Sequence, residues 1–255
     1  MILVLGGTAE ARELAGALDA AGVHVTSSLA GRVSRPRLPS GTVRIGGFGG
    51  PDGLARWLTE RGVAAVVDAT HPFAERISDS AATACPRAGV PLLRLQRPVW
   101  SERPGDEWHW VEDLDEAAAA IPSLGERVLL TTGRQGLPAF ASVHDAWFLV
   151  RCVEPPEPPL PPRHELLLDR GPYTVDGELA LVDEHRVELL VTKDSGGAHT
   201  EAKLEAARRR GLPVIVVRRP PRPDVACVSN VEDALAWGLA HERAHAVQSR
   251  RAHAG

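Results

Sequence analysis

The chain has 255 residues, 44% of them hydrophobic, and a formal net charge of −4 at pH 7. This composition supports a folded core in one large or two smaller domains, and the acidic balance disfavours a nucleic-acid surface, which is normally cationic. No apolar run in the sequence approaches the roughly 18 residues of a membrane span. We expect a cytoplasmic protein with neither nucleic acid nor membrane among its partners.

The cysteines and the missing motifs narrow the chemistry. Cys85, Cys152 and Cys227 are odd in number and widely spaced, so they predict neither a disulfide framework nor a metal site, and we expect three buried thiols. The sequence contains neither G-x-S-x-G nor G-x-x-x-x-G-K-[ST]. Hydrolase, NTPase and metalloenzyme activities are therefore disfavoured.

The first fifteen residues predict an apolar strand, a Gly6-Gly7-Thr8 turn and a helix with apolar residues at helical spacing. Glycine lets the backbone approach a pyrophosphate closely, and the helix N-terminus favours the anion. Thr8 can add a hydroxyl or cap the helix. This layout predicts a nucleotide-phosphate loop, although it departs from G-x-G-x-x-G and a Gly-Gly turn can also be purely structural.

The first half of the chain alternates between strands and helices, which is typical of a parallel sheet. The expected strands span residues 2–5, 24–28, 43–45, 63–68 and 91–95, and the expected helices follow Thr8 and span residues 51–61 and 74–88. Residues 96–106 are rich in proline and charge. We expect the chain to cross there into a second domain.

The second half repeats the alternation. Strands are expected at residues 127–130, 147–153, 165–168, 187–191 and 214–217, and helices at 113–120, after Arg134, and at 175–184, 198–210 and 231–240. Six of the nine residues from 154 to 162 are proline, which favours an extended surface connection. After residue 241 we expect a helix extension or a frayed tail.

These patterns predict an α/β fold of two Rossmann-like three-layer domains, with parallel sheets and a cleft between them. Residues 1–97 would form the domain that binds the nucleotide, and residues 98–255 would form a second α/β domain whose loops contribute to binding the substrate.

Ligands of open parallel sheets bind beyond the carboxyl ends of the strands. Ser28 and Arg32 follow the second strand, where hydroxyls and arginine accommodate the 2′-phosphate of NADP and an acidic residue would favour NAD. Asp68, Thr70 and His71 follow a later strand and would edge the same cleft. His71 could be an acid, a substrate donor or a helix cap.

Three loops of the second half present hydroxyls, glycines or cations after a strand. Thr132 lies in one, and Arg170 in another could make a paired contact with a carboxylate. In the third, Lys193 supplies a point charge and the amides of residues 195–197 open a helix, which together would form an anion cradle. Each loop also fits ordinary turn chemistry, but their joint placement favours an anionic ligand.

Taken in order, the segments 4–12, 28–32, 68–74, 130–133, 170–172 and 192–197 resemble the precorrin-6A reductase family over nearly the whole chain. The Gly-Gly-Thr-x-Glu opening and the Lys-Asp-Ser-Gly loop are its most specific features. The resemblance implies an NADPH-dependent reductase of cobalamin biosynthesis that converts precorrin-6A to precorrin-6B (dihydro-precorrin-6A). It implies no metal site, and transient contact with neighbouring enzymes of the corrin pathway.

The resemblance also implies roles for individual residues. NADP would be held by Gly6, Gly7, Thr8, Glu10, Ser28, Arg32 and Thr70. The tetrapyrrole would be contacted by Thr132, Arg170, Lys193, Ser195, Gly196 and Gly197. Reduction requires a proton as well as a hydride, and the candidate donors by position are Asp68, His71, Lys193 and Asp194.

Several alternatives stay open at this point. The chain could be another NADP-dependent reductase of an anionic substrate, or a non-catalytic protein that binds NADP or a tetrapyrrole. A methyltransferase is disfavoured because Arg32 would then meet no phosphate. A metal-free and a cobalt-containing substrate fit the residues equally.

Overall fold

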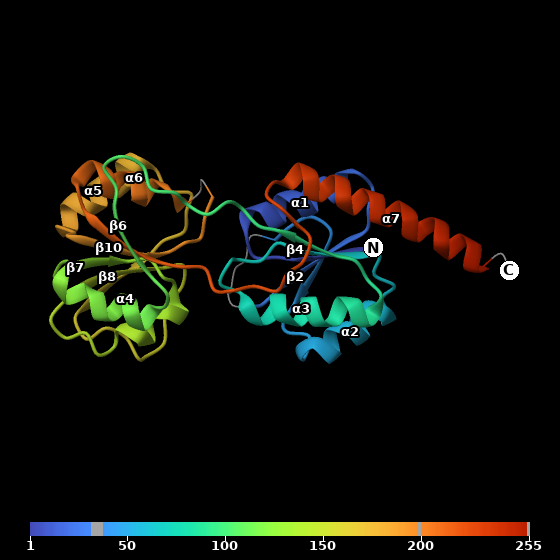
Figure 1. Ribbon diagram of the computed structural model, residues 1–255, viewed down its shortest axis with the longest axis horizontal. Helices are drawn as coiled ribbons and strands as arrows, with labels where there is room; N and C mark the ends of the chain where they lie inside the picture. The colour runs from blue at the N-terminus through green and yellow to red at the C-terminus, as the bar shows by residue number, and fades with distance from the viewer. Residues whose placement is uncertain (32–37, 198–199, 254–255) are drawn as a thin grey trace. The chain divides into compact units, whose positions relative to one another are not determined.

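The structure of the chain is a computed structural model that describes residues 1–31, 38–197 and 200–253. It divides into two compact units, one formed by residues 1–97 with 221–255 and the other by residues 98–220. Each unit has one six-stranded sheet, and the strand pairs of both sheets are parallel. The expected α/β class with two parallel sheets is confirmed (Figure 1).

The first unit has the strand order β12-β5-β4-β1-β2-β3. Its strands are β1 (Ile2–Leu5), β2 (Val25–Leu29), β3 (Thr42–Ile45), β4 (Ala65–Asp68), β5 (Leu92–Leu95) and β12 (Cys227–Val228). Its helices are α1 (Ala9–Ala20), α2 (Gly50–Glu60), α3 (Glu75–Ala88) and α7 (Val231–His253).

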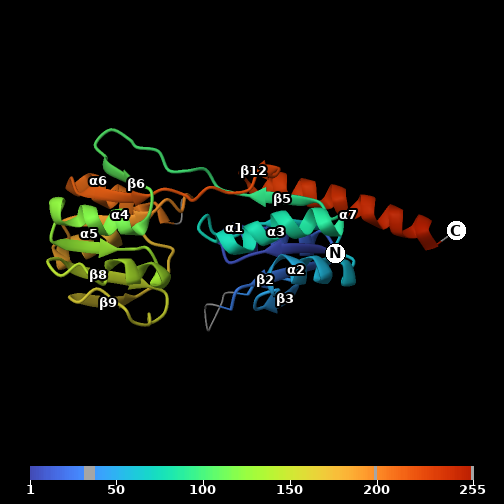
Figure 2. The same cartoon turned by 60° about the horizontal axis from the view of Figure 1, so that its bottom comes forward.

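Both faces of this sheet are covered by helices. Ile2 and Val4 pack in the core formed with α1 and α7, whereas Leu3 and Leu5 pack in the core formed with α2 and α3 (Figures 1 and 2). Side chains alternate along a strand, so a strand buried on both faces is apolar at every position. This explains the continuous apolar run at the start of the sequence.

The second unit has the order β6-β11-β10-β7-β8-β9. Its strands are β6 (Glu107–Val111), β7 (Arg127–Leu130), β8 (Trp147–Cys152), β9 (His164–Leu168), β10 (Leu189–Lys193) and β11 (Pro213–Val217). Its helices are α4 (Leu114–Ala120), α5 (Val175–His185) and α6 (Ala202–Arg210), with the 3₁₀-helices η1 (Ile121–Ser123) and η2 (Arg134–Phe140). Leu129 and Leu190 of the sheet pack with residues of α5 and α6.

Apart from the edge strands β12 and β6, the two sheets repeat one topology. In each, two connections lead outward from a central strand, β1 or β7, and the chain then returns to the other side of that strand as β4 or β10. Strand order therefore reverses between β1 and β4, and again between β7 and β10. Ligands of open α/β sheets bind at such reversals, so each unit offers one candidate site.

The division of the chain differs from the expected one at its C-terminal end. Strand β12 pairs with β5, and Ala234 of α7 is fully buried in the core that contains α1. Residues 221–255 therefore belong to the first unit and not to the second (Figure 2).

Other differences are local. Strands β6 and β12 were not expected, α6 begins at Ala202 instead of residue 198, and α7 continues to His253, so the tail is a helix extension. Among the described residues, no helix combines the length and hydropathy that crossing a membrane requires.

The place of α7 in the first core can be tested with two identical substitutions on one helix. Ala234→Glu puts a carboxylate in a fully buried position and should lower the free energy of unfolding by at least about 3 kcal/mol. Ala244→Glu lies at an exposed position and should change it by less than about 0.5 kcal/mol. Denaturant unfolding of both variants measures the difference, and equal effects would contradict the packing of α7 against the sheet.

Candidate functional site

The glycine loop of the first unit lies at the reversal of strand order. Leu5, at the end of β1, is in register with Ser28 of β2 and Asp68 of β4, so the loops that follow these strands are neighbours. The backbone N–H of Gly6 donates to the Ser28 carbonyl at 3.0 Å. Gly7 has φ +118°, and a Cβ placed there would have no atom within 4 Å. Glycine thus permits a left-handed turn with open space beside it.

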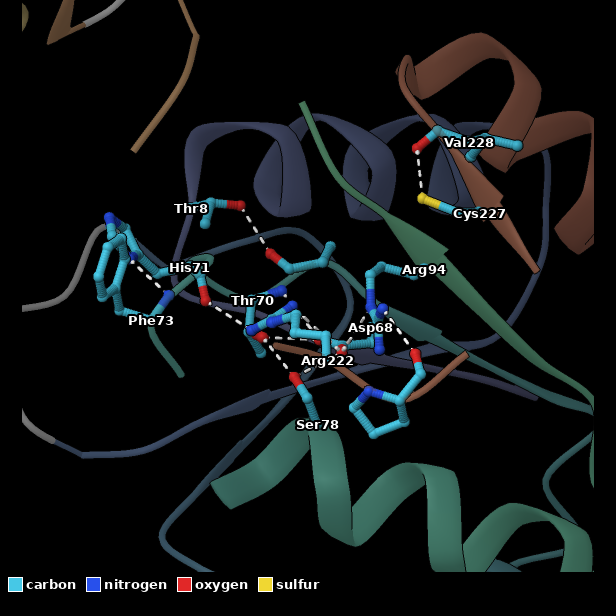
Figure 3. A network of polar contacts seen from close by, with 12 residues as sticks. Thr8, Asp68, Thr70, His71, Phe73, Ser78, Arg94, Arg222, Cys227 and Val228 are labelled. Carbon is cyan, nitrogen blue, oxygen red and sulfur yellow. Dashed lines mark hydrogen bonds and ion pairs between the residues drawn. The ribbon is translucent and has the colours of Figure 1, made fainter. Parts of the chain in front are cut away.

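Thr8 joins the β1–α1 loop to the β4–α3 loop. Its hydroxyl accepts from the backbone N–H of Ala11 at 3.1 Å as the cap of α1, and donates to the Ala69 carbonyl at 2.8 Å (Figure 3). Because the hydroxyl proton is committed to Ala69, Thr8 has none to give a phosphate. An anion at this loop would be held by main-chain N–H groups at the start of α1.

Glu10 is paired with a cation. Its carboxylate lies 3.3 Å from Arg97, and both residues line a small hollow with Thr8 and Thr70. A lone carboxylate in the first turn of α1 would repel a phosphate. The ion pair with Arg97 removes this repulsion, so Glu10 is compatible with an anion at the helix N-terminus.

Behind the hollow, Asp68 is buried in a network of hydroxyls and arginines (Figure 3). Its Oδ1 accepts from the Thr70 hydroxyl at 2.6 Å and the Thr70 N–H at 3.2 Å, and its Oδ2 accepts from the Ser78 hydroxyl at 2.6 Å. Guanidinium nitrogens of Arg94 and Arg222 each lie 3.8 Å from Oδ2. The side chains of Asp68, Arg94 and Arg222 are only 2%, 8% and 8% exposed, so the charges compensate one another away from water.

The two arginines hold the segment that precedes β12. Arg222 ties this segment to the β4–α3 loop, and Arg94 ties it to β5. Arg222 donates to the His71 carbonyl at 2.9 Å, and Arg94 donates to the Pro223 carbonyl at 3.0 Å. Burial lowers the pKa of the Arg222 guanidinium, and the negative charge of Asp68 opposes this shift. Sequence reasoning proposed Asp68 as an acid but missed both arginines, because only the fold brings Arg222 beside β4.

His71 lies partly exposed in the same loop. Its Nδ1 accepts from the Phe73 N–H at 3.2 Å, so a neutral ring carries its proton on Nε2. The cap position of α3 is Ala74, so the helix-cap alternative for His71 is wrong.

The end of β2 carries the residues expected to distinguish NADP from NAD. Ser28 is buried at 8% exposure, and Arg32 lies outside the described residues. Sequence reasoning missed Arg44, which is in register with Ser28 on β3. Its guanidinium donates to the carbonyls of Gly46 and Gly47 at 2.6 and 2.8 Å and lies over the Phe48 ring.

In the second unit, the loop after β10 is held by the segment that enters the unit. Asp194 accepts from the Trp100 N–H at 3.2 Å and forms an ion pair with Arg219 at 3.1 Å. Gly196 has φ +62°, and a Cβ there would overlap the Pro98 carbonyl and the Arg219 guanidinium. Asp194 and Gly196 are therefore both needed for the structure of this loop.

The neighbouring loop residues differ in how they are presented. Lys193 and Ser195 are partly exposed at the end of β10, and the Ser195 hydroxyl donates to the Lys193 carbonyl at 3.2 Å. The Gly197 carbonyl accepts from the Trp100 indole at 3.4 Å. Among the described residues of this loop, Lys193 is thus a partly exposed cation at the end of β10.

Thr132 and Arg170, the remaining candidates for binding the substrate, lie on different parts of the sheet. Thr132 follows β7, beside β10, but its hydroxyl is buried with no hydrogen-bond partner among the described residues. Arg170 is exposed after β9, which lies three strands from β10, or about 14 Å at the spacing of sheet strands. The loop after β10 thus adjoins Thr132 but not Arg170.

Two further features concern metals and thiols. Sequence reasoning against a metalloenzyme overlooked the H-E-x-x-H at residues 241–245 of α7, which has a zinc-enzyme spacing. Within the described residues, no three His, Cys, Asp or Glu side chains could together hold a metal ion. Burial and the nearby Asp68 raise the pKa of Cys85 to about 12, so it is an unreactive thiol. Cys227 is exposed, contrary to expectation, because it lies on the edge strand β12.

The comparisons with known proteins identify the family. The model of the family described as Precorrin-6x reductase CbiJ/CobK matches residues 1–238. The chain belongs to this family. A precorrin-6A reductase of Rhodococcus erythropolis is 56% identical over 238 residues, which are 92% of this chain and 96% of that protein. A cobalt-precorrin-6A reductase of Priestia megaterium is 31% identical over 232 residues, covering 86% and 91% of the two chains.

A solved structure described as CobK precorrin-6A reductase matches the fold. It has a TM-score of 0.88 and 42% identity, with 94% of this chain and 96% of that one covered. The CbiJ/CobK family match therefore extends over both compact units and ends inside α7. A reductase of this family makes a nicotinamide cofactor plausible.

The tie made by Arg222 gives a stability prediction for this family member. Arg222→Met removes the bond to the His71 carbonyl and one of the two cations beside Asp68, and should cost about 2 kcal/mol of unfolding free energy, since Arg94 still compensates the carboxylate. Arg218→Met breaks an exposed pair with Glu112 and should cost less than about 1 kcal/mol. Equal losses in denaturant unfolding would contradict the tie.

Proposed function

We propose that this member of the CbiJ/CobK family is a precorrin-6A reductase. It would reduce a double bond of the corrin macrocycle with NADPH and release precorrin-6B (dihydro-precorrin-6A) in cobalamin biosynthesis. The observation that carries the proposal is the 56% identity to the Rhodococcus erythropolis precorrin-6A reductase over nearly the full length of both chains.

The first unit fits a dinucleotide at the reversal between β1 and β4. The open space beside Gly7 admits a pyrophosphate, and the start of α1 supplies main-chain donors. The Ser28 hydroxyl and the Arg44 guanidinium, with no acidic side chain between residues 27 and 31, support NADP over NAD. When bound, the reduced nicotinamide supplies the hydride.

The relatives support a metal-free substrate. Five precorrin-6A reductases are 43% to 56% identical to this chain, whereas three cobalt-precorrin-6A reductases are 28% to 33% identical. We therefore assign precorrin-6A in place of its cobalt complex. Its carboxylates would be met by Lys193, with the amides of residues 196 and 197 nearby, whereas the Ser195 amide donates to the Lys193 carbonyl.

The groups that face solvent differ from those that hold loops. Asp68 accepts three hydrogen bonds from Thr70 and Ser78, and Asp194 accepts one from the Trp100 N–H and pairs with Arg219, so we assign both to holding their loops. His71 and Lys193 are partly exposed and remain the candidates for supplying the proton, His71 through Nε2. A cytoplasmic location and transient contact with neighbouring corrin-pathway enzymes are part of the same proposal.

The test is anaerobic mixing of the protein with NADPH and precorrin-6A while the tetrapyrrole spectrum and the nicotinamide band are followed together. The reductase predicts coupled changes in both spectra. Tight NADPH binding without any spectral change would favour a non-catalytic binding protein, and NADPH oxidation only with a smaller anionic substrate would favour another reductase.

Lys193 has a separate expected effect on kinetics. Lys193→Ala removes a charge-assisted contact with a substrate carboxylate and should raise the KM for precorrin-6A about tenfold or more. The Kd for NADPH should stay within about twofold, because the dinucleotide loops belong to the other compact unit. Lys193→Arg retains the cation and should recover much of the loss. Steady-state kinetics measure both constants, and an unchanged KM would remove Lys193 from the substrate site.

A further inference from the structure

The Thr70 hydroxyl has only one hydrogen-bonding function left for a ligand. It donates its proton to Oδ1 of Asp68 at 2.6 Å, while the nearby Ser78 hydroxyl gives its own proton to Oδ2 at the same distance. The two hydroxyl oxygens lie 3.3 Å apart, but neither has a proton left to donate to the other. What Thr70 presents to its surroundings is a lone pair.

This arrangement is rigidly supported. Asp68 cannot turn away, because Thr70 N–H also donates to it and the guanidinium groups of Arg94 and Arg222 flank Oδ2. Arg222 in addition fixes the carbonyl of the next residue, His71. Figure 3 shows Thr70, Ser78 and the arginines converging on Asp68. Asp68, Arg94 and Arg222 are positioning residues that keep Thr70 an acceptor.

Thr70 also lies where a ligand can reach it. It is partly exposed and lines the hollow that contains Thr8, Glu10 and Arg97, on the β4 side of the strand reversal. A dinucleotide whose pyrophosphate lies at the β1–α1 loop places its adenosine toward β2 and its other half toward β4. The group nearest Thr70 would then come from the nicotinamide half.

We propose that Thr70 determines specificity for a neutral amide donor, accepting a hydrogen bond from the carboxamide NH₂ of the nicotinamide ring. The inference rests on the proposed use of NADPH. A carboxylate at the same place has no proton to donate and would set its lone pairs against that of Thr70. The site should therefore reject the deamido form of the cofactor, in which an acid replaces the amide.

The experiment compares the binding of NADP⁺ and nicotinic acid adenine dinucleotide phosphate to the full chain by calorimetric titration. The intact protein should bind NADP⁺ about tenfold or more tightly than the acid analogue. Thr70→Val should weaken NADP⁺ binding about fivefold and should not weaken binding of the analogue, because the opposing lone pair is lost with the hydroxyl. Thr70→Ser keeps a hydroxyl on Asp68 and should keep the preference.

Ser78→Ala is the matched control. It removes the other hydroxyl bound to Asp68, which is buried and does not line the hollow, so it should leave the ratio of the two affinities within twofold. Equal affinity of the intact protein for both dinucleotides, or equal weakening of both by Thr70→Val, would overturn the role of Thr70 while leaving NADP binding in place. Failure of the intact protein to bind either dinucleotide would overturn the cofactor assignment and this inference together.

Discussion

The burial of Asp68 is the constraint around which the first unit is arranged. An ionised carboxylate away from water is tolerated only when cations and hydrogen-bond donors surround it. Here the donors come from the β4–α3 loop and α3, and the cations come from β5 and the segment that precedes β12. One charge therefore joins four parts of the chain, and the loop that carries Thr70 and His71 takes its shape from them.

The second unit also buries a carboxylate beside an arginine. Asp194 is buried beside Arg219 and also accepts from the backbone of Trp100. The loop that presents Lys193 is thus anchored by the next residue in the chain. In both units a buried carboxylate at the end of a central strand holds the loop, and a partly exposed residue, Thr70 or Lys193, lies within two positions of it. Rigid support of this kind is what a reaction that depends on orientation requires.

Much of this could be predicted from the sequence, because the signals are local. Apolar runs predicted the strands β1, β4, β7, β10 and β11. The turn before α1 was also predictable, since Gly7 adopts a positive φ and Thr8 caps the helix. Strand β6 alternates polar and aromatic residues at a sheet edge, and β12 is too short for any periodicity. Thr70 and Ser78 lie close to Asp68 in the sequence, but the arginines beside Asp68 and Asp194 lie far away. Only long-range strand pairing brings these arginines near. The sequence therefore predicted which loops form the candidate site, but it did not predict that Asp68 and Asp194 hold those loops in place.

The return of residues 221–255 to the first unit has a consequence for how the chain acquires its structure. Residues 98–220 are continuous, so all of the second unit has been synthesised once residue 220 is reached, whereas the first unit lacks β12 and α7 until residues 221–253 have followed. Domains usually fold in the order of their synthesis. In this chain the order of synthesis is inverted: the unit that begins first is completed last, and until then Asp68 lacks the guanidinium of Arg222 and the β4–α3 loop lacks one of its supports.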